Sequence, residues 1–399
     1  MWPRLASLLR CPLCRRTLRF ARFAPNSGAD AGDAWIESGV LSCSTCRTWY
    51  PIVHGVPVML PYATLVHREF ETSHSDELAA HAPACTYPAG TGVPGEELVM
   101  RSFSTEWLSY DFDGVIWEMH YGDHEKRFLT ELGSYAPRRD RPRRFLELGC
   151  GLGITTRMAQ ENFGGEAIGV DLSKAAWRAA VSNRQNRSLH FVQASVFALP
   201  FEPHTFDTIY TRGVLHHTYS TRDAFHALAH MARPGGALYV WIYGPKSVND
   251  NLFRRAAYAS EVVLRFMLNR SPWWISNLVL VPLAIGYLVF NRIRHWANRN
   301  IQAYNFTRAL HAARDRYTPE FAHRHSAQEV CTWFGEAGFS DYEIVDWRTM
   351  PSADHDDYRR NTGVRGRRAA AAANPWTFAS QASQEGSERH RPTGASTSR

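Results

Sequence analysis

The chain has 399 residues, of which 44% are hydrophobic and 21% charged, a balance typical of a globular protein rather than a disordered one. The formal net charge is +7, but arginine supplies nearly all of the 45 basic residues, and these are spread along the chain. We interpret this skew as coding bias and do not expect nucleic-acid binding. The N-terminus contains no apolar run long enough for a signal peptide, which predicts a cytoplasmic protein.

Two cysteine pairs stand near the N-terminus, Cys11 with Cys14 and Cys43 with Cys46, separated by 28 residues. Pairs at this spacing in a chain without a secretion signal favour a tetrahedral Zn²⁺ site over disulfides. We therefore predict a zinc-ribbon domain over residues 1–62.

The segment that follows these cysteines carries a further motif. The run Tyr50-Pro-Ile-Val-His-Gly-Val-Pro57 resembles the Y-P-I-x-x-G-I-P sequence of the zinc-ribbon activator subunit of tRNA and protein methyltransferases. The resemblance implies a docking or stabilising module without chemistry of its own, and in that family the metal is often absent. Residues 63–140 are expected to be a mainly helical linker that contains the aromatic residues Trp107, Tyr110 and Trp117.

The most informative stretch is Arg144–Gly153, a short apolar strand that runs into a glycine-rich turn. A helix follows, and a second strand, Glu166–Asp171, ends in an acid. This order is typical of a nucleotide site, because glycines let the backbone approach a ligand, a helix N-terminus offers free N–H groups and the acid can bind ribose hydroxyls.

The spacing of the turn separates two kinds of cofactor. The pattern Glu147-x-Gly149-x-Gly151-x-Gly153 lacks the third glycine of the NAD fingerprint and resembles the first motif of class I S-adenosylmethionine-dependent methyltransferases. The resemblance implies that these four residues line the methionine and ribose end of the cofactor. It also implies that Asp171 binds the ribose hydroxyls, with Leu172 beside it.

Strands alternate with helices through residues 141–245 and 324–368, which predicts an α/β fold with a doubly wound, Rossmann-like, mostly parallel sheet. Four more motifs follow in order and resemble the ubiquinone and menaquinone C-methyltransferase group: Ala198-Leu-Pro-Phe201, Phe206-Asp207, Val214-Leu-His-His217 and Arg233-Pro-Gly-Gly236.

One position departs from that group. Relatives carry an aspartate that accepts a hydrogen bond from the adenine amino group, and Ser195 stands in its place. The Ser195 oxygen or the backbone N–H of Val196 is then expected to contact the ring. His216 and His217 follow the fourth strand of the sheet, where an acceptor would lie, and a neutral imidazole can take a proton near pH 7. Both are candidate catalytic bases.

Residues 246–323 form an insertion, and within it Trp273–Phe290 is free of charge and flanked by arginines. Three interpretations remain: a buried lid helix over the substrate site, an interfacial helix on a bilayer, or a membrane span. The interfacial interpretation predicts peripheral contact through 246–294 at the inner face of the membrane. The composition of residues 369–399 predicts a disordered tail.

Taken as a whole, the sequence predicts a methyltransferase that uses S-adenosylmethionine, holds a structural Zn²⁺ and acts on a small-molecule or lipid-linked acceptor. Two alternatives stand beside it: an RNA methyltransferase, which the zinc ribbon and the positive charge suggest, and a non-catalytic methyltransferase-like scaffold.

Overall fold

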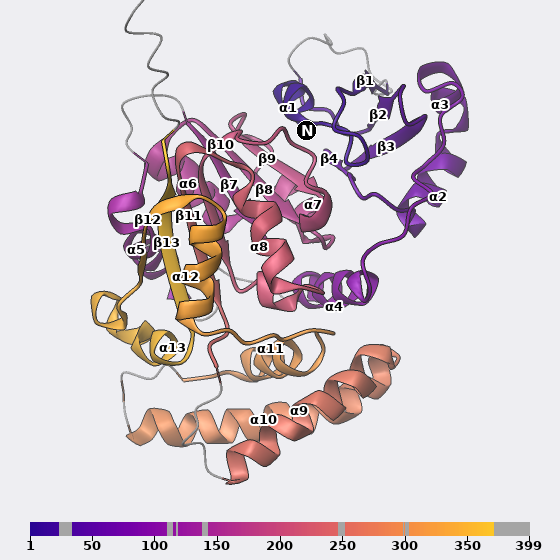
Figure 1. Cartoon of the computed structure of the whole chain (residues 1–399). Coiled ribbons are helices and arrows are strands. Elements are labelled where there is room, and N and C mark those ends of the chain that lie inside the picture. The colour runs from indigo at the N-terminus through magenta and orange to yellow at the C-terminus, as the bar shows by residue number, and fades with distance from the viewer. Residues whose placement is uncertain are drawn as a thin grey trace, which may run out of the picture.

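A computed structural model describes residues 1–23, 34–109, 115–116, 119–137, 143–245, 252–297, 299 and 303–370 (Figure 1). The expected disordered tail, apart from its first two residues, lies outside this range, as do Tyr110 and Trp117.

The centre of the molecule is a seven-stranded sheet, in which only one strand runs against the others. That strand is β13 (Thr362–Arg368), which pairs antiparallel with both of its neighbours in the sheet. The predicted mostly parallel, doubly wound sheet is therefore confirmed. In spatial order the strands are β12 (Phe339–Ile344), β13 (Thr362–Arg368), β11 (Ala232–Ile242), β10 (Phe206–Arg212), β7 (Arg144–Leu148), β8 (Glu166–Asp171) and β9 (Leu189–Gln193).

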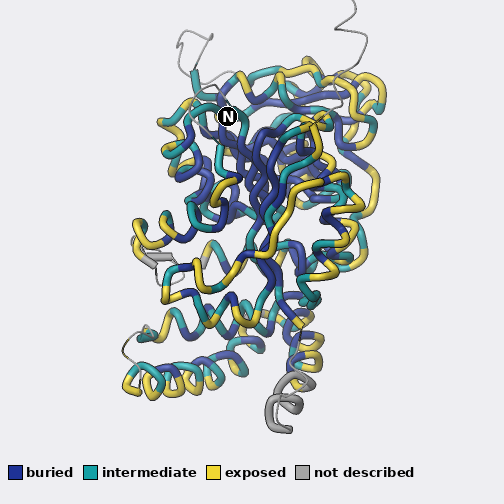
Figure 2. Tube along the Cα trace, turned by 60° about the vertical axis from the view of Figure 1, so that its left-hand side comes forward, coloured by how far each residue is buried: buried dark blue, intermediate teal, exposed yellow. Residues whose placement is uncertain are grey.

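Helices cover both faces of the sheet because successive strand residues point to opposite sides. Phe145 and Tyr210 pack with α5 (Tyr121–Leu132), α6 (Ile154–Phe163) and α7 (Ala175–Ser182). Their neighbours in sequence, Leu146 and Ile209, pack on the other face with α8 (Thr221–Ala229) and α12 (Ala327–Glu336). Figure 2 shows the resulting buried core along the middle of the molecule.

The N-terminal domain is a small antiparallel sheet preceded by α1 (Pro3–Leu8). Its strands are β1 (Arg19–Arg22), β2 (Gly39–Cys43), β3 (Thr48–Val53) and β4 (Val56–Pro57).

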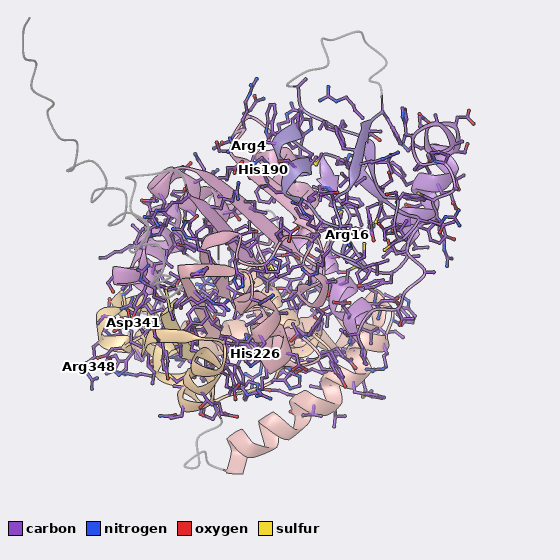
Figure 3. The ribbon with its side chains drawn as sticks, turned by 45° about the horizontal axis from the view of Figure 1, so that its top comes forward. Arg4, Arg16, His190, His226, Asp341 and Arg348 are labelled. Carbon is purple, nitrogen blue, oxygen red and sulfur yellow. The ribbon has the colours of Figure 1, made fainter. Side chains whose placement is uncertain are left out.

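This domain closes one edge of the central sheet. Val58 bridges to Gln193 of β9, and the Met59 N–H donates to the Gln193 carbonyl (2.7 Å). On α1, Arg4 forms an ion pair with Glu166 (2.5 Å), which also lies close to His190. Figure 3 labels Arg4 and His190, which lie where the two domains meet. An open edge strand invites pairing with other chains, so this contact protects β9.

Two other segments supply further helices. In the first, α2 (Leu65–Ser73) and α3 (Ser75–His81) pack on the N-terminal sheet through Phe70 and Leu78, whereas α4 (Glu96–Ser109) lies at the carboxyl end of the parallel strands. The short pair β5 (Val115–Ile116) and β6 (Met119–His120) follows. The second holds α9 (Leu252–Arg270), α10 (Trp273–Ala297) and α11 (Phe306–Tyr317). Figure 1 shows α11 between the sheet and the pair α9 and α10. A short helix, α13 (His355–Arg360), precedes β13.

Within the described residues one helix, Trp274–Ala297, is long and apolar enough to cross a membrane by length and composition.

Candidate active site

The glycine turn between β7 and α6 adopts a backbone that only glycine takes easily. Gly149, Gly151 and Gly153 have φ of 73°, 48° and 75°. A Cβ on Gly149 would lie 2.1 Å from a methyl carbon of Val214, whereas one on Gly151 would just touch the Trp107 ring at 3.4 Å. The first glycine is required by packing, and the second leaves the backbone open beneath an aromatic ring of α4.

Asp171 fastens this turn from the end of β8. Its Oδ2 accepts the Gly151 N–H (2.8 Å), and its Oδ1 accepts the Ser173 N–H (2.8 Å) and hydroxyl (2.7 Å). Burial raises the pKa of Asp171, and these hydrogen bonds oppose that shift. A carboxylate oxygen has two lone pairs, so Oδ2 keeps one acceptor position for a ligand hydroxyl.

Turn and acid open into a cavity of about 890 Å³, which lies in the size range of sites for drug-sized ligands. The inner end is lined by Gly149, Asp171, Leu172, Val196 and Phe197, with Val99 and Met100 of α4 among the other lining residues. The cavity continues to residues from the insertion and from α13, including Tyr304, Asp315 and Arg359.

The sequence-predicted site residues fall into two groups. Gly149, Asp171, Leu172, Val196 and His217 line the cavity. Glu147, Gly151, Gly153, Ser195 and His216 are not among the lining residues, and they support the first group from the layer around it.

Ser195 has a partner that its sequence neighbourhood does not reveal. Its hydroxyl donates to the carboxylate of Glu96 at the start of α4, and it accepts the Phe197 N–H (3.2 Å). Glu96 is buried and lines the cavity close to Leu172 and Val196. A carboxylate is therefore present where Ser195 replaces the aspartate of relatives, but it comes from a segment 99 residues earlier.

The two candidate histidines have different environments. His217 Nδ1 lies 2.7 Å from the Phe321 carbonyl, which can only accept, so Nδ1 carries the proton. Burial lowers the pKa of His217 to about 4, and the neutral ring keeps Nε2 as an acceptor. His216 is fully buried, stacks on Tyr243 (3.8 Å between centroids) and has a pKa well below its usual value because of burial.

Two further acidic groups reach the cavity beside His217. The Tyr243 hydroxyl, at the end of β11, donates to Asp315 Oδ2 of α11 (3.1 Å). Glu106 of α4 pairs through Oε1 with His311 (2.5 Å), while its buried Oε2 has no hydrogen-bond partner within the described part of the chain. Both acids line the cavity, and sequence reasoning did not single out either one.

Glu147 lies beneath the turn as a fully buried acid whose Oε2 accepts the Thr156 hydroxyl (2.5 Å). Burial raises the pKa of Glu147 to about 8, so the folded protein holds a proton that the unfolded chain releases near pH 4.5. Between these values this carboxyl binds fewer protons in the unfolded chain, so the contribution of Glu147 to the free energy of unfolding falls as pH rises.

We expect Glu147→Gln to flatten this decline, because glutamine keeps an acceptor for Thr156 and cannot ionise. The wild-type slope from pH 5 to 8 should exceed that of the variant by at most about 1.4 kcal/mol per pH unit. Urea denaturation at several pH values measures it, with exposed Glu71→Gln as the matched control. Identical slopes for wild type and Glu147→Gln would contradict the assignment.

The four N-terminal cysteines converge, with all Sγ atoms within 4.8 Å of one another. The pairs Cys11–Cys46 and Cys14–Cys43 are 3.9 and 3.6 Å apart. A tetrahedral Zn²⁺ with bonds of about 2.3 Å requires sulfur–sulfur separations of about 3.8 Å, so the cluster fits this ion.

Comparison with known families matches both the domain that contains the cavity and the N-terminal domain that contains the cysteine cluster. Residues 146–240 match the family model described as a methyltransferase domain, and residues 3–55 match that of Trm112p-like proteins. The chain joins a class I methyltransferase domain to a Trm112p-like domain. Methyltransferase domains of this class use S-adenosylmethionine, and the residues Asp171 and Val196 of this domain line the cavity.

Relatives of the methyltransferase domain match only part of the chain. It is 35% identical over 136 residues to an uncharacterised protein of Synechococcus, covering 33% of this chain and 31% of that protein. It is 35% identical over 122 residues to malonyl-[acyl-carrier protein] O-methyltransferase of Enterobacter lignolyticus, covering 30% and 47%. The chain thus spans less than half the length of these curated relatives.

Among solved structures, the chain is similar to a phosphoethanolamine N-methyltransferase of Haemonchus contortus in complex with S-adenosylhomocysteine. The TM-score is 0.42 and the identity 14%, over 72% of this chain and 62% of that one.

Proposed function

We propose that the protein transfers a methyl group from S-adenosylmethionine to a small-molecule or lipid-linked acceptor bound in the cavity. The observation that carries this proposal is continuity: Gly149 of the glycine turn and Asp171 line the same cavity as His217, Tyr243 and Asp315. A cofactor at the inner end therefore has an enclosed space beside it for a second molecule.

At the inner end, Asp171 Oδ2 would receive a ribose hydroxyl, while Leu172, Val196 and Phe197 provide apolar walls for the adenine ring. The Glu96 carboxylate supplies the acceptor for the adenine amino group, held by Ser195. The unpartnered Oε2 of Glu106 suits a cationic group such as the amino group of the methionine moiety.

When bound, the cofactor supplies a methyl group activated by its sulfonium, and the protein must orient the acceptor and remove its proton. His217 is the proposed base on its geometry: the Phe321 carbonyl fixes its Nδ1–H, and its Nε2 is left as an acceptor on a ring that lines the cavity. Its pKa of about 4, lowered by burial, makes it a weak base. The Asp315–Tyr243 pair lies beside His217, with the Tyr243 and His217 ring centroids 5.5 Å apart, and can orient an acceptor hydroxyl or amine by hydrogen bonding.

Calorimetric titration with S-adenosylmethionine tests the proposal. We expect binding by the wild-type protein and at least about tenfold weaker binding by Asp171→Ala, since a charge-assisted hydrogen bond contributes about 1.5–3 kcal/mol. Asp171→Asn should lie between the two, because it keeps one acceptor oxygen.

Exposed Asp76→Ala is the control, and thermal melts show whether each variant is folded. If the folded wild-type protein gives no heat and no shift in melting temperature with the cofactor, the proposal fails and the scaffold alternative takes its place.

A further inference from the structure

The long helix α10 has two unlike faces. Its inner face packs on α11 through Leu280 and Ala284, which meet Ala309 and Ala313. Polar contacts reinforce this side: Arg314 donates to Asn277 Oδ1 (2.8 Å) and the Tyr304 N–H donates to Asn291 Oδ1 (2.6 Å). The apolar and polar side chains of the inner face thus have their partners within the protein.

The outer face of α10 is an exposed apolar stripe at helical spacing. Its large side chains are between 50% and 78% exposed and recur every three to seven residues: Trp274, Leu278, Ile285, Val289, Ile293 and Trp296. Figure 2 shows exposed positions along the outer edge of this helix, on the side away from the sheet.

The neighbouring helix α9 adds to this surface. Val262, Val263, Phe266 and Met267 are 58–66% exposed, whereas Leu268 and Arg265 on its other side are buried. Burying this many apolar side chains would be favourable, and exposed apolar surface of this extent marks an interaction site. We call the outer faces of α9 and α10 the apolar platform.

The charge around the platform indicates what it meets. The sequence of residues 252–299 contains seven arginines and one acid, Glu261, which is 5% exposed and paired with Arg316. Of these arginines, Arg265 is buried on the opposite side of α9, and Arg270 and Arg294 form ion pairs with Glu320 and Asp356. Arg292 and Arg299 are exposed at the end of α10. Tryptophans stand near both ends of α10, as they do where helices meet the boundary between lipid and water.

A helix that crosses the bilayer would place all its sides in hydrocarbon, and the inner face of α10 argues against this. There Arg316 donates to the Tyr287 hydroxyl (2.9 Å), and Arg314 donates to Asn277, so charged groups of α11 lie along the helix. The same helix can lie flat, with its outer face in the interfacial layer and its inner face on the protein.

We propose that the apolar platform docks on the surface of an anionic lipid bilayer. Apolar side chains enter the interfacial layer, and the exposed Arg292 and Arg299 meet anionic headgroups. This proposal stands apart from the reaction, but Asn291 and Arg294 of α10 also line the cavity. If the proposed function holds, docking would bring the part of the cavity that is lined by residues of the insertion, where the acceptor would bind, close to the lipid surface.

Vesicle flotation with the full chain tests the platform. We expect binding to vesicles of phosphatidylcholine and phosphatidylglycerol in a ratio of about 7:3, at least about tenfold tighter than to phosphatidylcholine alone, and weaker at high salt. The double variant Leu278→Glu with Val289→Glu should lose at least about tenfold in binding, since it puts two carboxylates on the platform.

The matched control replaces two exposed apolar residues away from the platform, Leu65→Glu with Val181→Glu, and should bind as wild type does. Absence of wild-type binding to both vesicles overturns the proposal. So does self-association in sedimentation velocity that the platform variant abolishes without any lipid effect, because the occupant is then a second copy. Cofactor calorimetry on the platform variant separates these outcomes from failure of the proposed function.

Discussion

Replacing Cys43 with serine will remove the metal from the N-terminal domain and lower the melting temperature of the whole chain by several degrees or more. The cluster fits one Zn²⁺, and structural zinc contributes about 10–16 kcal/mol of apparent binding energy to small zinc domains. The loss should extend beyond the ribbon because residues 58–59 cover strand β9 of the methyltransferase sheet.

Zinc content by mass spectrometry and thermal melts with and without a chelator measure both parts of this effect. The wild-type protein should hold one zinc per chain, and chelation should reproduce the Cys43→Ser melt. Cys331→Ser is the control, because this thiol lies on α12 away from the cluster and is only partly buried. A metal-free wild-type protein whose melt is insensitive to chelation would show that the cysteines hold the ribbon without metal.

The ribbon also touches the inner end of the cavity, so the same experiment has a functional readout. Val58, Leu60 and Tyr62 form a small core with Leu172, which lines the part of the cavity proposed to hold the cofactor. Loss of the metal should therefore weaken cofactor binding as well as stability. This contact is a physical reason to expect that the N-terminal domain stabilises the methyltransferase domain and takes no part in catalysis.

The sequence predicts those features of the site that depend on residues close together in the chain. The glycine turn, Asp171 and the alternation of strands with helices are such features, and they follow from short motifs and periodicity. Positive φ at Gly149 and the hydrogen bond from Gly151 to Asp171 are what such a motif encodes.

The missed features depend on contacts between distant segments. The Glu96–Ser195 bond joins residues 99 apart, and the Tyr243–Asp315 bond joins residues 72 apart, with no repeat or spacing to announce them. The insertion was ambiguous for another reason: an uncharged run of α10 fits a lid, an interface or a span, and only its packing on α11 shows which side is already occupied.

Arg212→Met should cost about 3–5 kcal/mol of the free energy of unfolding, among the largest effects expected of a single substitution. Arg212 ends β10, donates through Nε to Glu131 Oε1 (3.0 Å) and through Nη2 to Asp357 Oδ2 (2.6 Å). Glu131 has no exposed surface, so removing the guanidinium would leave a buried carboxylate with the more distant Arg127, whose Nε lies 3.9 Å from Glu131 Oε1 compared with 3.0 Å for Arg212.

Hydroxyls cannot replace that cation. Tyr210 and Tyr358 each donate to Glu131 at 2.5 Å, which satisfies its lone pairs without neutralising its charge. Denaturation in guanidinium chloride should give the loss, and Arg212→Met combined with Glu131→Gln should recover part of it, because the double variant removes both charges. If the two single losses simply add in the double variant, the pair is not coupled, and the stability of this region comes from packing of the Arg212 side chain on Trp241 instead.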